Sequence, residues 1–199
     1  MKHPFLCALM ILPMLSCSGN EDSTAESPNP AVKQVYQFQY KDYKVQNISL
    51  YKGPSGHKTN PAESYLNTYW STYKEPTWKS IGMDLKNNSL KLVSGTSAEI
   101  TYPMKIEKDS VFINENDGKS FIGIFNKTEA SFTLKRSLRY IKKMPRENVN
   151  ALIISQKVTF GVTGYQDIFG NSIFGSPSDM NETGDDIIWS NIDYHYSSL

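Results

Sequence analysis

The two histidines beyond the N-terminal region, His57 and His195, are the side chains best suited to acid–base chemistry near neutral pH. They lie far apart in the sequence among polar neighbours, which favours two surface histidines over a catalytic pair. Ser55, in Gly53-Pro54-Ser55-Gly56, lacks the strand–Gly-x-Ser-x-Gly–helix frame of a nucleophile elbow. No glycine loop for phosphate and no distinct pair of carboxylates stands out. The sequence therefore predicts a protein that is not an enzyme, with a hydrolase as the least favoured alternative.

An acidic stretch at residues 179–186 carries oxygen ligands of the kind that a hard cation prefers. Asp179, Asn181 and Asp185 are the candidate ligands, and Gly184 is the sixth residue counted from Asp179. The twelfth residue is Ser190 rather than the bidentate glutamate of an EF-hand. The pattern favours a solvated acidic turn, with an irregular calcium site as the alternative. No metal site and no cofactor is predicted.

The densest aromatic cluster lies at residues 69–78 and supplies the candidate ligand contacts, Tyr69, Trp70, Tyr73 and Trp78. Aromatic faces stack on apolar molecules and on sugar rings, and tyrosine hydroxyls form hydrogen bonds. Core packing explains the same residues, because aromatic side chains dominate core burial. The cluster is therefore read either as core or as the border of a ligand site.

One helix is expected over residues 61–74. Asn60 precedes Pro61 at the first helical position, and Glu63 follows three residues after Asn60, as in a capping box. Apolar residues then recur at helical spacing up to Pro76, which ends the pattern. We therefore expect an amphipathic helix of about three turns.

Most other segments alternate apolar and polar residues, which is typical of strands with one buried face. Tyr36, Phe38 and Tyr40 are an example near the start of the chain, and Ile192, Tyr194 and Tyr196 predict a final strand. Turn signals such as Asn87-Asn88 and Asn116-Asp117-Gly118 separate the segments. The predicted fold class is all-β, mainly antiparallel: a barrel or a sandwich of about 8–10 strands.

The composition is that of a globular protein of one domain: 199 residues, 39% hydrophobic and 21% charged. The 21 lysines and arginines against 20 acidic residues argue against a nucleic-acid partner, which needs a basic excess or a basic face.

Residues 1–16 have the organisation of a signal peptide, because Lys2 and His3 precede an apolar run that is too short to span a bilayer. Met14-Leu15-Ser16-Cys17 follows and resembles a bacterial lipobox. The resemblance implies cleavage before Cys17 and fatty acylation (palmitate and similar chains) of this residue, so that the membrane is a partner through the anchor. Cys7 leaves with the signal, which excludes a disulfide and a thiolate nucleophile. An ordinary signal peptide is the alternative.

Residues 17–30 are small, polar and acidic, and they predict a disordered tether ahead of one β-rich domain at residues 31–199. Glu21 and Asp22, close to Cys17, resemble the export signal of surface lipoproteins in Bacteroidetes-type bacteria. This implies a lipid-anchored protein at the surface of the outer membrane. Ser23 and Ser110 stand in tripeptides that resemble O-glycosylation signals of such bacteria, and whether either is modified stays open.

The order of a strand, a capped segment and a meander of hairpins, best seen at residues 78–138, resembles the calycin group of lipocalin-like and fatty-acid-binding-like barrels. The Gly-x-Trp of that group is absent, because Thr68, Pro76 and Ile187 stand two residues before the three tryptophans. The resemblance implies a barrel that binds a small apolar or amphipathic ligand and transfers no site residue. The alternative is a surface β-sandwich module that binds a glycan or a protein partner, as an accessory to nutrient uptake or adhesion.

Overall fold

The computed structural model describes residues 33–115, 118–147, 150–170 and 173–199. The predicted signal peptide, Cys17, the tether and Ser23 lie outside these residues, as do Asn116 and Asp117 of the expected turn. No helix within the described ranges is long and apolar enough to cross a membrane.

The described residues form ten strands in one sheet, and each pair of neighbours is antiparallel. The strands are β1 (Val35–Lys52), β2 (His57–Thr59), β3 (Trp78–Asp84), β4 (Ser89–Ser94), β5 (Glu99–Glu107), β6 (Ser110–Glu115), β7 (Gly118–Asn126), β8 (Ser131–Lys143), β9 (Ile153–Phe160) and β10 (Asp186–Ser198). The predicted final strand is confirmed as β10.

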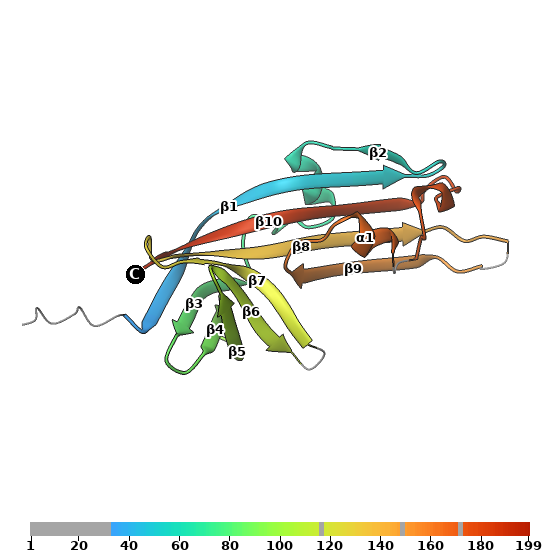
Figure 1. Cartoon of the computed structure of the whole chain (residues 1–199). Coiled ribbons are helices and arrows are strands. Elements are labelled where there is room, and N and C mark those ends of the chain that lie inside the picture. Colours follow the sequence, from blue (N-terminus) through green and yellow to red (C-terminus); the bar gives the residue numbers. More distant parts are fainter. Residues whose placement is uncertain (1–32, 116–117, 148–149, 171–172) are drawn as a thin grey trace, which may run out of the picture. The chain divides into compact units, whose positions relative to one another are not determined.

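Eight of these strands close into a barrel in the order β1-β3-β4-β5-β6-β7-β8-β10, because β10 pairs with both β8 and β1 (Figure 1). The all-β, antiparallel prediction is confirmed, and the open choice between barrel and sandwich is resolved as a barrel. Where these eight strands pair around the barrel, closure leaves no free edge.

Three strands are much longer than the others and run past the barrel (Figure 1). β1 pairs with β3 only over Val35–Gln39, and β8 pairs with β7 only as far as Leu134. Beyond these points β1, β10 and β8 continue side by side, with β2 on the outer edge of β1 and β9 on that of β8. We call residues 43–52, 136–143 and 186–193, together with β2 and β9, the sheet extension.

Strand alternation fills the barrel with side chains. Within the barrel, alternate residues of β1, β8 and β10 face inward, and Phe38, Leu134 and Tyr196 are almost fully buried there. An eight-stranded barrel is wide enough either for side chains to fill it or for one small ligand, and here core side chains occupy it. Each large side chain buried in this way contributes about 1.5–3 kcal/mol, so a packed core can stabilise the domain.

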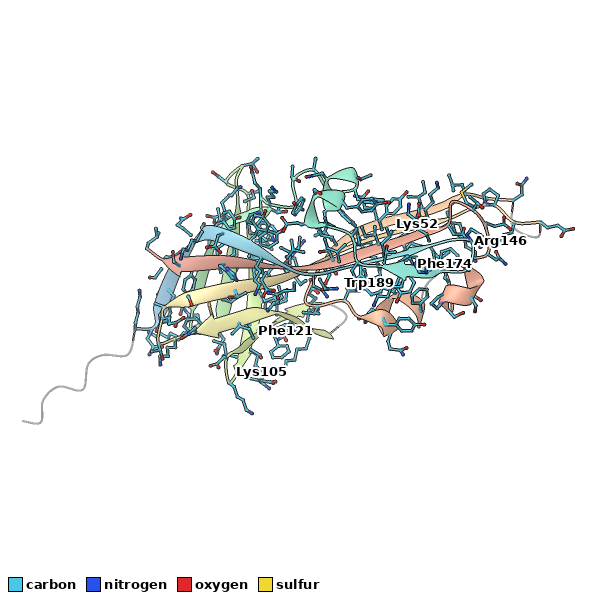
Figure 2. All side chains as sticks on the ribbon, turned by 90° about the horizontal axis from the view of Figure 1, so that it is seen from above. Lys52, Lys105, Phe121, Arg146, Phe174 and Trp189 are labelled. Atoms are coloured by element: carbon cyan, nitrogen blue, oxygen red, sulfur yellow. The ribbon has the colours of Figure 1, made fainter. Side chains whose placement is uncertain are left out.

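A second core covers one face of the sheet extension. Tyr51 and Trp189 stack there with ring centroids 5.5 Å apart. The helix α1 (Tyr165–Phe169) and the loops around the 3₁₀ helix η2 (Pro177–Asp179) add Phe169, Phe174 and further apolar residues. Figure 2 shows Phe174 and Arg146 in this part of the domain, away from Phe121 of the barrel.

The helix expected at residues 61–74 is shorter than predicted and of a different type. A 3₁₀ helix, η1, spans Glu63–Thr68, and its N-cap is Ala62 without a side-chain hydrogen bond. The predicted capping box does not form, because the Glu63 carboxylate accepts hydrogen bonds from the hydroxyls of Tyr43 and Tyr73 instead, each at 2.9 Å. We call residues 60–77 the cover segment, since this stretch packs against the barrel core through Leu66, Trp70 and Tyr73.

Candidate ligand-binding site at the barrel mouth

The site lies where β8 changes its partner. The pairing of β8 with β7 ends at Leu134, and the pairing with β9 begins at Arg136, opposite Phe160. The first residues of β7 and the last of β9 therefore border an opening in the side of the sheet. We call this end of the barrel, where β3 begins and the cover segment crosses, the barrel mouth.

Two adjoining spaces occupy the barrel mouth. The inner cavity has a volume of about 80 Å³ and is lined by Trp70, Tyr73, Trp78, Leu134, Arg136, Tyr194 and neighbouring residues. The outer pocket has about 480 Å³ and is lined by Trp78, Glu115, Ser120, Arg136, Val158, Thr159 and Phe160. Trp78, Arg136 and Val158 line both, so the two spaces are neighbours.

Arg136 is the charged group of the inner cavity. It stands between Leu134 and Leu138 on the inward face of β8, and both leucines are buried. Its guanidinium carbon lies 4.3 Å from the centre of the Phe160 ring, a cation–π contact. Burial lowers the pKa of Arg136 from its ordinary value, and the nearby tyrosine hydroxyls of Tyr194 and Tyr196 only partly oppose this. An arginine remains charged at neutral pH after such a shift.

Within the described residues, the guanidinium of Arg136 has no carboxylate partner and no hydrogen-bond acceptor. The two carboxylates at the rim have other partners. Glu75 forms a 3.2 Å ion pair with Lys79, and Glu115 accepts a 2.8 Å hydrogen bond from the hydroxyl of Ser120. The positive charge of the half-buried Arg136 is thus left without an ion-pair partner in the described residues.

Two further donors at the cavity lack acceptors. The indole Nε1 atoms of Trp70 and Trp78 are buried and unpartnered in the part of the chain that the structure describes. Trp70 is only 7% exposed, so bulk water does not satisfy it. Buried donors are almost always hydrogen-bonded, and two exceptions on one cavity need an explanation.

Tyrosine hydroxyls fix the cover segment over the cavity. Tyr194 donates to the carbonyl oxygen of Tyr73 at 2.7 Å, and Tyr196 donates to that of Trp78 at 2.6 Å. Burial raises the pKa of Tyr194 to about 12 and raises the pKa of Tyr196 further. Both hydroxyls therefore stay protonated as donors at physiological pH, and they position the backbone that carries the indole rings.

Three of the four ligand-contact residues predicted from the sequence line the inner cavity: Trp70, Tyr73 and Trp78. Tyr69, the fourth candidate, lies beside them, with its ring 4.7 Å from that of Tyr140. Arg136 was not predicted, although an arginine at an inward position of an alternating run was a usable signal.

The acidic candidates have partners of their own. Asp185 is fully buried, and its Oδ2 is 2.6 Å from the guanidinium of Arg146. Oδ2 of Asp179 accepts hydrogen bonds from the backbone N–H groups of Gly175 and Ser176, while Asn181 is exposed. Among the described residues, no three His, Cys, Asp or Glu side chains gather as a metal site.

The remaining singled-out residues lie on the surface or at strand ends. Nδ1 of His195 is 2.6 Å from Oδ1 of Asp42, and His57 is exposed on β2. Ser110 begins β6 beside the exposed Asp109.

Comparisons of the chain with protein-family models, with curated proteins and with solved structures found no match. A closed barrel of this kind hosts many unrelated functions. The inner cavity and the outer pocket are therefore the basis on which a function can be argued.

Proposed function

We propose that this chain is a lipid-anchored, non-enzymatic protein of the bacterial outer membrane that binds a small amphipathic ligand at the barrel mouth. The anchor is Cys17, and the acidic residues after it favour exposure at the cell surface. The observation that carries the proposal is the pair of adjoining spaces, one small and lined by donors, the other larger and partly apolar.

The dimensions support binding at the mouth rather than deep in the barrel. The interior is occupied by core side chains, whereas the outer pocket, at about 480 Å³, lies within the range of about 300–1,000 Å³ for small-molecule sites. Trp78, Val158 and Phe160 give this pocket apolar walls. Val158 is 45% exposed, so its apolar surface is available to a ligand.

The glycan-binding alternative has less support from the same residues. A sugar platform needs exposed, coplanar aromatic faces. Trp70 and Tyr73 are buried, while Tyr69 and Trp78 are half-buried. The predicted cluster is therefore better suited to enclosing a ligand than to presenting a flat face to an oligosaccharide.

A blocking variant tests the proposal. Val158→Trp fills the outer pocket, and Ile154→Trp is its matched control, because Ile154 is exposed on the same face of β9 and lines neither space. Native mass spectrometry of protein purified from its own membranes should find a bound small molecule in the wild type and in Ile154→Trp. Its occupancy should fall sharply in Val158→Trp. Equal occupancy in all three proteins would place the ligand elsewhere.

A further inference from the structure

We propose that the inner cavity binds an oxyanion, the carboxylate or phosphate end of the ligand, through the guanidinium of Arg136, beside the indole rings of Trp70 and Trp78. The inference rests on the ligand binding proposed above and adds the chemical class of the ligand's polar end.

The first argument is the charge of Arg136. Arg136 is half-buried, and a charge that is partly withdrawn from water is stabilised by a partner of opposite charge. The guanidinium lies against the Phe160 ring and near neutral tyrosines. Glu75 pairs with Lys79, and the exposed carboxylate of Glu115, which accepts a hydrogen bond from Ser120, forms no ion pair with Arg136. An anion from outside the chain would supply the missing charge.

The second argument is the imbalance of donors and acceptors. The guanidinium of Arg136 carries several N–H donors and lines the cavity without an acceptor in the described residues. The backbone carbonyl oxygens of Tyr73 and Trp78 already accept hydrogen bonds from Tyr194 and Tyr196. A ligand group with several acceptor oxygens and no protons to donate complements such a cavity.

The third argument is size. At about 80 Å³ the inner cavity is much smaller than the outer pocket, which suits a compact group such as a carboxylate or a phosphate better than a long hydrocarbon chain. The apolar part of the ligand would extend into the outer pocket, along Val158 and Phe160. The ring of Phe160 covers the guanidinium carbon, and a guanidinium stacked in this way keeps its N–H edge available for an oxyanion.

The test compares ligands that differ only in their polar end. Full-length protein in phosphatidylcholine nanodiscs is titrated with octanoate, octyl phosphate, octanol and inorganic phosphate, with empty nanodiscs as the reference. Tryptophan fluorescence reports binding, because Trp70 and Trp78 line the cavity. Octanoate or octyl phosphate should bind roughly 10- to 100-fold more tightly than octanol, the gain expected for charge-assisted hydrogen bonds.

Variants assign this preference to Arg136. Arg136→Gln should lose the preference for the anion over octanol, and Arg136→Lys should keep part of it. Arg139→Gln is the matched control, because Arg139 lies on the opposite face of β8 and reaches the backbone oxygen of Asp167. It should behave as the wild type.

The outcomes separate this inference from the function on which it rests. If octanol and octanoate bind equally and Arg136→Gln changes neither, the ligand site stands and the oxyanion site is wrong. If none of the amphiphiles binds, the proposed function is wrong as well. If inorganic phosphate binds as tightly as octyl phosphate, the site takes a free anion, and the amphiphile assignment is overturned.

Discussion

Replacing Arg136 by methionine should make the free protein more stable, although it removes a long side chain from the barrel mouth. Arg136 is half-buried, so its unpaired charge carries only part of the several kcal/mol that full burial of an ion costs, and the cation–π contact with Phe160 offsets some of that part. Methionine fills a similar volume and needs no counter-charge. We therefore expect the free energy of unfolding of Arg136→Met to rise by up to about 2 kcal/mol.

The measurement is urea denaturation and calorimetry of the ligand-free protein. For a domain of this size, a gain of about 2 kcal/mol corresponds to an increase in Tm of roughly 4–8 °C. Leu138→Met, on the same face of β8, is the control and should lose less than about 1.5 kcal/mol, because it nearly conserves volume. If Arg136→Met is less stable than this control, the guanidinium makes stabilising contacts in the free protein, and the reasoning about an unpaired charge is refuted.

Three further changes test other parts of the molecule. Asp185→Asn should lower the free energy of unfolding by about 3–5 kcal/mol, because it leaves Arg146 without its buried partner. Glu75→Gln, in an exposed ion pair, should change it by less than about 1 kcal/mol. Losses of similar size for the two variants in urea denaturation would contradict this. Burial raises the pKa of Asp186 above 3.8, so the folded state binds this proton more tightly than the unfolded state and stability falls as pH rises from 3.8 through the raised pKa. Asp186→Asn should remove this dependence of the free energy of unfolding on pH. A variant with the same pH profile of stability as the wild type would contradict the assignment to Asp186. Cys17→Ala should release the protein from membranes into the soluble fraction, and its retention in sedimented membranes would show that the lipobox interpretation is wrong.

The all-β class could be predicted because alternation is a local signal. Tyr36 and Phe38, or Tyr194 and Tyr196, show which face is buried without reference to any other strand. Closure of the barrel could not be predicted in the same way. It depends on β10 pairing with both β1 and β8, which joins residues far apart in the chain, such as Tyr40 with Tyr196.

The expected helix shows where local signals mislead. The spacing of apolar residues at 61–74 is helical, yet Tyr43 and Tyr73 hold the Glu63 carboxylate, and the chain forms only six residues of 3₁₀ helix. Tertiary contacts thus override the capping pattern. The helix α1 was not expected, because five residues are too few to show a helical period.

The candidate site was predicted in part for a similar reason. A dense cluster of tryptophan and tyrosine predicts either core or a ligand site from the sequence alone, and Trp70, Tyr73 and Trp78 do line one cavity. Arg136 is a single charged residue among apolar neighbours, and its importance depends on what surrounds it in space. That β8 exchanges β7 for β9 at this residue is a property of the whole sheet.

A crystal structure of the protein with octanoate or octyl phosphate would test the central claim most directly. The account predicts the ligand's oxygen atoms within about 3 Å of the Arg136 guanidinium nitrogens and its chain along the outer pocket. Ligand density at another surface, with the barrel mouth occupied only by solvent, would contradict it.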